Sequence, residues 1–338
     1  MTKIPSPAPA ADPPWAAPAR SLPALILAIL LSTGCASPSL DAGLDRFVPM
    51  TQERTGVALA LPLPLPLPQP QASQASADDV IDALLEQPLE PDAAMRIALL
   101  NNPAWQPQSA RLGVAQTVAL TAPVRQAYFL ALAAQQALLT LEQASEAAGL
   151  AAELAARMAR AGNLSHLERS REQALHADTV VRLMRARHAH LVAREELTRL
   201  MGLRGPQEFS LPQRLPELPG AIFTSDAIEA LALQDRTSAV ADQTRPQVRQ
   251  AYAAYQTAHQ LARHYRDEVV PLRKEISEQL LLRYNGMLIG VLELLADARA
   301  QIEAVHDGIL AQRDFWLAET ALQVALYGRA AAPAGQGE

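Results

Sequence analysis

Aromatic residues and cysteine are scarce in this chain of 338 residues. Phe, Trp and Tyr together make up 4% of it, although 49% of its residues are apolar. Alanine and leucine supply most of that apolar content between residues 112 and 330. A β-sandwich is usually rich in aromatic and β-branched strands, so this balance favours closely packed helices. The single cysteine, Cys35, excludes an internal disulfide framework.

Signatures of an enzyme or a nucleic-acid-binding protein are missing as well. Basic residues are dispersed among acidic ones and the net charge is −6, which leaves no cationic patch for nucleic acid. The sequence contains no glycine-rich phosphate loop, nucleophile motif or carboxylate cluster. His188 and His190 are two positions apart, whereas metal-binding pairs on a helix are three or four apart. We therefore expect a non-enzymatic protein without a metal site or cofactor.

The N-terminal region has the pattern of a secretory signal. Basic residues precede an apolar run, Ala24–Leu31, which is too short to span a membrane. The Leu-Ser-Thr-Gly-Cys that follows resembles the lipobox of bacterial lipoproteins. The resemblance predicts that Cys35 becomes an acylated N-terminus, and Ala36 after it favours the outer membrane. The alternatives are an ordinary signal peptide with an incidental cysteine, or a buried free thiol.

The composition divides the chain into segments. We expect a signal peptide with lipobox (1–35), a Pro-rich linker (36–78), a first helical repeat (79–202), a crossover linker (203–220), a second helical repeat (221–328) and a disordered tail (329–338). Within the first linker, Leu59–Pro70 alternates leucine with proline. Proline at that density removes the amide donors that a helix needs, so an extended spacer is predicted.

Two copies of one unit are visible in the helical region. The pentapeptide Val-Arg-Gln-Ala-Tyr occurs at Val124–Tyr128 and again 124 positions later, at Val248–Tyr252. The glycine-containing motif Ala161–Leu164 matches Asn285–Leu288 at the same offset. Similarity at a fixed spacing indicates a duplicated structural unit. Each copy is predicted to form a long helix, a glycine turn and a second long helix.

The last arm of the second copy carries a heptad pattern. Apolar residues from Leu288 to Ile309 follow steps of three and four, and Gln312 and Trp316 continue these steps. Such a seam packs knobs into holes against a neighbouring helix. In the preceding arm, Pro271 is expected to kink the helix locally. Each arm is about 50 Å long at 1.5 Å per residue, so a hairpin needs other helices to bury its apolar faces.

These features predict an all-α fold of two duplicated, long antiparallel helical hairpins. They resemble the TolC-type outer-membrane efflux family, especially its lipoprotein members. The resemblance is carried by the signal, the segment Asp92–Pro103, both hairpins with their turns, and the closing Leu197–Gly202. It covers most of residues 20–330. Its most specific elements are Arg160–Ser165 and Tyr284–Val291, because the turn, its spacing and its duplication agree.

The resemblance implies a homotrimer whose helices form a periplasmic tunnel. Its turns would lie at the periplasmic tip and contact a membrane-fusion adaptor coupled to an inner-membrane pump. The implied contact residues are Gly162, Asn163, Leu164 and Ser165 in the first turn, and Asn285, Gly286, Met287 and Leu288 in the second. The polar residues among them are equally open to a role in turn formation. Both turn glycines are expected to have positive φ.

One departure from the family pattern is large. Family members insert helical arms and a pair of membrane strands in each repeat, where this chain has only Ala104–Pro123 and Thr237–Gln247. A membrane-spanning strand needs about 9–11 residues of alternating polarity, and a pair also needs a loop. Neither interval has that pattern. The β-barrel strands are therefore predicted to be largely absent from both halves.

The predicted function is that of a TolC-like lipoprotein, lipid-anchored on the periplasmic face of the outer membrane. It would form the helical periplasmic conduit of a tripartite efflux system. The alternative is a periplasmic coiled-coil scaffold, or a degenerate family member, that binds a partner without conducting. The shortened intervals favour that alternative.

The lipobox leads to a direct test at Cys35. Replacing Cys35 with Ser should abolish labelling by radioactive palmitate, because the thiol that carries the acyl chain is gone. The variant should also be released from membranes by mild washing. Equal labelling of the two proteins would contradict the assignment.

Overall fold

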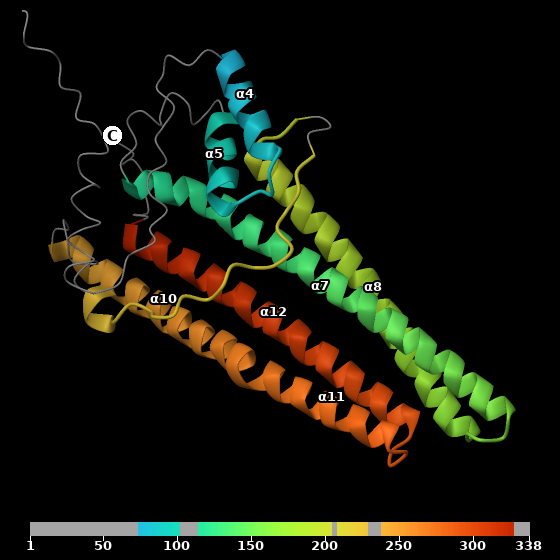
Figure 1. Ribbon diagram of the computed structural model, residues 1–338. Coiled ribbons are helices and arrows are strands. Elements are labelled where there is room, and N and C mark those ends of the chain that lie inside the picture. The colour runs from blue at the N-terminus through green and yellow to red at the C-terminus, as the bar shows by residue number, and fades with distance from the viewer. Residues whose placement is uncertain (1–73, 102–113, 205–207, 229–237, 328–338) are drawn as a thin grey trace, which may run out of the picture. The chain divides into compact units, whose positions relative to one another are not determined.

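The computed structural model describes residues 74–101, 114–204, 208–228 and 238–327, which form helices and the loops that join them (Figure 1). No strand occurs within these ranges. The predicted all-α fold is therefore confirmed for this part of the chain. Residues 114–123 and 238–247, the described portions of the two shortened intervals, are helical. Cys35 and the lipobox lie outside the described residues, so their assignment stays a prediction.

The helices follow the order of the two repeats. α4 (Gln74–Leu85) and α5 (Pro91–Asn101) are short and precede the first hairpin. That hairpin consists of α7 (Val114–Arg160) and α8 (His166–Met201). In the second hairpin, the first arm is built from α10 (Ser238–His264), a π-helical turn η1 (Tyr265–Val269) and α11 (Val270–Asn285), and the second arm is α12 (Val291–Tyr327).

α7 and α12 are the inner helices of a four-arm array. α7 packs against α8 and α12, and α12 packs in turn against α10 and α11. At the end away from the turns, the order across the array is α8, α7, α12 and α10–α11, with α8 and α10–α11 at the edges (Figure 1). Towards the turns α8 crosses α7 and approaches α12, with which it forms ion pairs. The two predicted antiparallel hairpins are confirmed, and the contact between α7 and α12 joins them.

Small side chains allow α7 to approach its neighbours closely. Its buried surface is made largely of alanine: Ala127, Ala131, Ala133, Ala137, Ala144, Ala148, Ala151, Ala152 and Ala155. Alanine has the highest helix propensity, and the distance between packed helix axes falls as the contact side chains become smaller. The same residues thus favour the helix and permit its close packing.

Aromatic rings and one ion pair fill the junction between the repeats. Phe129 of α7 stacks on Trp316 of α12 with 5.2 Å between ring centroids, and Phe315 lies edge-on to Trp316 at 5.0 Å. Beside the rings, Arg125 of α7 and Glu319 of α12 form a 2.8 Å ion pair with side chains only 9% and 15% exposed. Burial raises the pKa of Glu319, and Arg125 opposes that shift. Loss of either partner would leave a buried charge unpaired, which is strongly destabilising.

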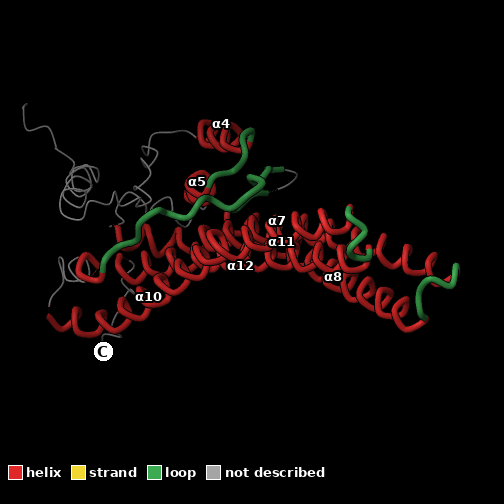
Figure 2. The backbone as a smooth tube through the Cα atoms, turned by 60° about the horizontal axis from the view of Figure 1, so that its bottom comes forward, coloured by secondary structure: helices red, strands yellow, loops and turns green. Residues whose placement is uncertain are grey.

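The segment 208–223 forms an extended strap that crosses all four arms, and Figure 2 traces it as a long loop. Its backbone carbonyls accept hydrogen bonds from side chains of each arm. The pairs are Arg194 of α8 with Phe209, Gln135 of α7 with Pro212, Gln312 and Trp316 of α12 with Pro216, and Tyr252 of α10 with Phe223. A proline carbonyl remains a full acceptor although its amide donates nothing. The strap therefore fastens the two hairpins to each other.

The first arms of the two repeats end one residue apart, counted from the pentapeptide that they share. Arg160 ends α7 36 positions after Val124, whereas Asn285 ends α11 37 positions after Val248. The second repeat therefore contains one additional residue between its valine and its turn.

The π-helical turn η1 accommodates that residue. The amide of Val270 donates to the carbonyl of Tyr265, five positions earlier, where an α-helix would bond four positions earlier. Both side chains lie against Gly308 of α12, each 3.7 Å from the position that a Cβ would take there. In a regular α-helix, residues five apart diverge by about 140°, so η1 is what gives them a common face. The irregularity that is observed, η1, ends two residues before Pro271, and the kink predicted at that proline stays a prediction.

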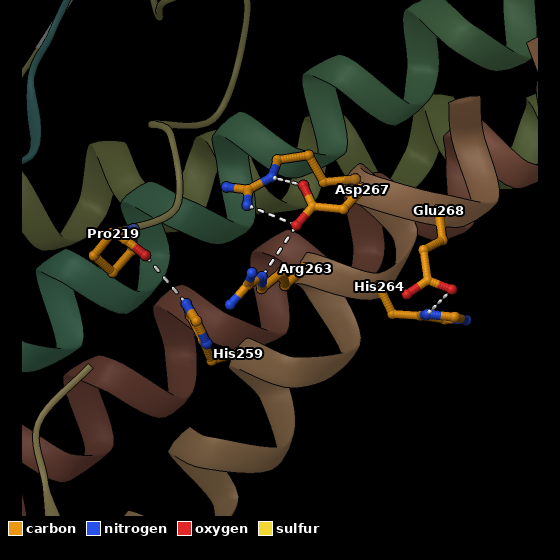
Figure 3. Close-up of polar contacts among 7 residues, drawn as sticks. Pro219, His259, Arg263, His264, Asp267 and Glu268 are labelled. Carbon is orange, nitrogen blue, oxygen red and sulfur yellow. Dashed lines mark hydrogen bonds and ion pairs between the residues drawn. The ribbon is translucent and has the colours of Figure 1, made fainter. Parts of the chain in front are cut away.

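The charged residues around η1 form ion pairs within their own arm (Figure 3). Asp267 accepts hydrogen bonds from Arg263 at 3.0 Å and from Arg266 at 2.7 Å. These hydrogen bonds lower the pKa of Asp267 to about 2. His264 and Glu268 lie 3.3 Å apart on the same exposed side. The ring nitrogen of His259 contacts the carbonyl of Pro219 in the strap at 3.1 Å. The turn is therefore polar towards solvent and apolar only towards Gly308.

Deleting Glu268 should convert η1 into regular α-helix at a cost of about 1 kcal/mol or less. Tyr265 and Val270 would then stand four positions apart and keep their common face on Gly308. Deleting Glu278 is the matched control, because its side chain is 64% exposed against 65% for Glu268. That deletion should rotate the rest of α11 by about 100° and cost about 2 kcal/mol, more than the deletion of Glu268. Thermal unfolding followed by circular dichroism measures both, and equal losses would contradict the interpretation.

Candidate functional site

The two hairpin turns, 161–165 and 286–290, lie at the same end of the array (Figure 1). Glu172, seven residues into α8, forms a 2.7 Å ion pair with Arg299, nine residues into α12. Further along the same helices, Arg182 and Glu303 are 2.9 Å apart. Both ion pairs join the arms that leave the turns. We refer to these turns, with the last helical turn before each, as tip 1 and tip 2.

Tip 1 closes as a Schellman motif around Gly162. The amide of Gly162 donates to the carbonyl of Ala159 at 3.1 Å, and the amide of Asn163 donates to that of Met158 at 2.9 Å. Gly162 has φ of +79°, as predicted, and nothing lies within 4 Å of where a Cβ would be. Backbone conformation alone therefore requires glycine at this position.

Ser165 caps the start of α8. Its hydroxyl accepts a hydrogen bond from the amide of Glu168 at 3.1 Å, and its own amide donates to the Glu168 carboxylate at 3.0 Å. This capping box satisfies the free amide groups at the start of α8. The hydrogen bonds from Ser165 lower the pKa of the Glu168 carboxyl group. Of the two roles left open for Ser165, the geometry supports turn formation.

Tip 2 closes by the same hydrogen bonds, one residue later than predicted. The amide of Met287 donates to the carbonyl of Tyr284, and the amide of Leu288 donates to that of Arg283, both at 2.9 Å. The left-handed residue is Met287, with φ of +57°. The expectation that Gly286 has positive φ is wrong, since its φ is −79°. The reason is η1, which absorbs one residue and brings α11 to the turn one position later in the sequence.

This shift changes which residues of the two tips are equivalent. Gly162 corresponds to Met287, and Asn163 corresponds to Leu288. Leu164 corresponds to Ile289, and both are half-buried beside the helix ends. The predicted equivalence of Leu164 and Leu288 is therefore wrong, because Leu288 is 73% exposed.

The predicted contact residues differ widely in accessibility. Asn163 and Asn285 are exposed at their turns. Met287 is 93% exposed, and together with Leu288 it has the most exposed large apolar side chain in the described part of the chain. Leu288 also lies outside the helix that its heptad position predicted, since α12 begins at Val291. Tip 2 therefore presents apolar side chains to solvent where tip 1 presents a glycine and an amide.

A groove of about 870 Å³ runs between α7, α8 and α12. Its apolar lining includes Ala133, Ala137 and Leu141 of α7, Leu175 and Val192 of α8, and Leu310 of α12. His306 also lines it, and burial lowers the pKa of that imidazole. Sequence reasoning missed this groove, because it depends on how three helices from two repeats are placed, which no local pattern encodes.

No group of three or more His, Cys, Asp or Glu residues in the described ranges is placed to hold a metal ion. Among the described helices, none is both long and apolar enough to span a membrane.

Comparison with known proteins supports the fold but not a closer relationship. No protein-family model matches the chain, and no curated protein matches its sequence. Solved structures do match. CusC, described for conformational changes that accompany folding and transmembrane channel formation, has a TM-score of 0.53 at 13% identity, over 75% of this chain and 96% of its own. The outer-membrane channel CmeC of Campylobacter jejuni has a TM-score of 0.50 at 11% identity, over 71% of this chain and 68% of its own.

A membrane protein from Pseudomonas aeruginosa is similar at the same level. Its TM-score is 0.50 at 15% identity, over 70% of this chain and 73% of its own. The described helices thus have the fold of outer-membrane channel proteins. The TolC-type resemblance is confirmed at the level of fold.

The two turns lead to opposite effects of substitution. Gly162→Ala should lower the free energy of unfolding by about 1 kcal/mol, because alanine is strained at positive φ. Met287→Gly should raise it by up to about 1 kcal/mol, because it removes that strain. Gly286→Ala should be nearly neutral, since its φ is negative and an added Cβ meets nothing closer than 3.5 Å. Urea unfolding of the three variants measures the effects. A loss at Gly286 equal to that at Gly162 would refute the assignment.

Proposed function

We propose that this protein is the outer-membrane component of a tripartite efflux system, anchored by a lipid on Cys35. Its hairpin tips dock a periplasmic membrane-fusion adaptor, which couples it to an inner-membrane pump. One observation carries the proposal. The two long hairpins share the fold of outer-membrane channel proteins, and both tips lie at one end of the array. The protein performs no catalysis in this role.

The lengths of the arms suit a structure that crosses part of the periplasm. α7 has 47 residues and α8 has 36. At 1.5 Å per residue these helices extend about 70 Å and about 54 Å. The distance between the strap and the tips is therefore bridged by helix alone.

Both edges of the array carry apolar side chains exposed in a single chain. On α8, Val181, Met184 and Leu191 are 45%, 63% and 57% exposed, and with His188 they follow steps of three, four and three. On the opposite edge, Leu261 of α10 and Leu272 and Ile276 of α11 are also exposed. Two different apolar edges on one protomer suit a head-to-tail interface, which forms a ring when the rotation between protomers closes. We propose that the ring is the homotrimer that the resemblance implies.

Charged residues on α8 provide a test of this assembly. Met184→Glu combined with Leu191→Glu should dissociate the oligomer, because two carboxylates would be buried at the edge without partners. The fold of the single chain should remain intact, since both side chains are exposed in it. Leu150→Glu is the matched control, because 61% of Leu150 is exposed and it belongs to α7 and not to α8, α10 or α11. Analytical ultracentrifugation of the full, lipid-bearing chain in detergent measures the change.

A wild-type chain that sediments as a monomer would overturn the proposed assembly. Conductance across a planar bilayer then separates the two functions considered for the chain. A conduit should give discrete channel openings that the double variant loses. A trimer that never conducts would instead support the scaffold.

A further inference from the structure

The duplication provides an internal comparison, because the two tips share a backbone conformation but not a chemistry. Under the structural equivalence, Leu281, Leu282, Met287 and Leu288 of tip 2 stand where tip 1 has Ala156, Arg157, Gly162 and Asn163. Every one of the four larger apolar residues is therefore replaced by a small or polar residue in the other copy. We call these four residues of tip 2 the apolar knob.

The apolar knob does not belong to the core of the hairpin. Its exposed fractions are 49% for Leu281, 63% for Leu282, 93% for Met287 and 73% for Leu288. The half-buried residue between the helix ends is Ile289, as Leu164 is in tip 1. Ile289 therefore fills the space between the helix ends, and the knob is not needed for the packing of the turn. Leaving large apolar side chains in water is unfavourable, which indicates that another surface covers them.

The backbone of the knob is also not optimised for the free chain. Met287 occupies the left-handed conformation that Gly162 occupies without strain in tip 1. A glycine stands directly before it, at Gly286, where the negative φ does not require one. Strained residues are retained mainly where the surrounding function needs them. Methionine is suited to such a position, because its flexible, polarisable side chain adapts to an apolar partner.

The charge around the knob indicates the chemistry of the partner. Residues 279–292 contain a single charged side chain, Arg283. The equivalent segment of tip 1, residues 154–167, contains two, Arg157 and Arg160, together with His166; a glutamate follows each segment directly, Glu293 in tip 2 and Glu168 in tip 1. A surface that pairs with tip 2 therefore gains little from charges of its own. It gains most from an apolar concavity that receives the convex end of a hairpin.

We propose that tip 2 alone inserts as an apolar knob into an uncharged, apolar socket of a helical protein partner, while tip 1 makes no comparable contact. This inference rests on the proposed function, in which that partner is the membrane-fusion adaptor. It adds that the two tips are not interchangeable docking points. It also adds that docking is driven by apolar burial rather than by ion pairs.

The test transfers the chemistry of tip 1 to tip 2 in the full, lipid-bearing chain. The variant Met287→Gly with Leu288→Asn should lower the affinity for the purified membrane-fusion adaptor of the same cell at least tenfold. Its urea midpoint should rise, because the left-handed methionine is gone. Lost binding with gained stability excludes misfolding as the cause. Leu167→Asn, which replaces another exposed leucine at the start of α8 (61% exposed, against 73% for Leu288), should leave the affinity within twofold.

Salt gives an independent measure of the same contact. The affinity of the wild-type chain for that adaptor should change less than threefold between 0.05 M and 1 M NaCl, because apolar burial is not screened. A tenfold or larger loss at high salt would overturn the proposal. So would retention of the wild-type affinity by the double variant.

Photo-cross-linking in intact cells separates failure of this inference from failure of the proposed function. Benzoylphenylalanine at position 288 should cross-link to the adaptor at least tenfold more strongly than at position 163. Adaptor products at position 163 alone, or equally at both, would overturn the inference and leave the function standing. No adaptor product at either position would overturn both.

A flotation assay tests a lipid surface as the alternative partner. The chain is mixed with vesicles of phosphatidylethanolamine and phosphatidylglycerol. If it floats with the vesicles and the double variant does not, the knob binds lipid and the proposal is overturned.

Discussion

The contact between α7 and α12 is the one on which the described unit depends. Within the described ranges it is the most extensive contact between arms of the two repeats, and it contains the Phe129–Trp316 stack and the Arg125–Glu319 ion pair. The strap crosses this contact, because Trp316 also donates to the Pro216 carbonyl. With the Glu172–Arg299 pair fixing the far end, the relative placement of the two tips follows. A binding surface at the tips is therefore supported by packing that lies far from it.

Much of this architecture could be predicted from the sequence, because it rests on local or periodic signals. The repeated motifs predicted two equivalent units, and the alanine-rich periodicity predicted long helices. Gly162 and Gly202 were placed correctly as turn and helix-end residues, and both have positive φ. Each of these signals depends on a few neighbouring residues. Placement of the hairpins side by side, by contrast, came from the family resemblance, and the fold comparisons confirm it at identities too low to transfer partners.

The register of tip 2 could not be predicted, because the responsible residues carry no recognisable signal. The sequence Tyr-Arg-Asp-Glu-Val of η1 would be compatible with ordinary helix. Its π-helical form becomes necessary only when Tyr265 and Val270 both meet Gly308 on another helix. The strap and the groove could not be predicted from the sequence for the same reason. Their hydrogen bonds and linings join residues that lie between 15 and about 180 positions apart, and no local sequence pattern links the partners.

The π-helical turn and the chemistry of tip 2 are two aspects of one constraint. Suppose that Tyr265–Asn285 were a single regular α-helix of the same sequence. Every residue after η1 would then be displaced by one helical position, which is about 100° around the axis and about 1.5 Å along it. Gly286 would then occupy the left-handed position, and Leu288 would occupy the half-buried place that Leu164 has in tip 1. The match between Gly162 and Gly286 in the sequence corresponds to this hypothetical register, and not to the register that is formed. In the register that is formed, the face shared by Tyr265 and Val270 is kept on Gly308, and the consequence twenty residues further along is that Met287 and Leu288 point into solvent. Exposure of the apolar knob is therefore set by helix packing in the middle of the arm, and not by the turn itself.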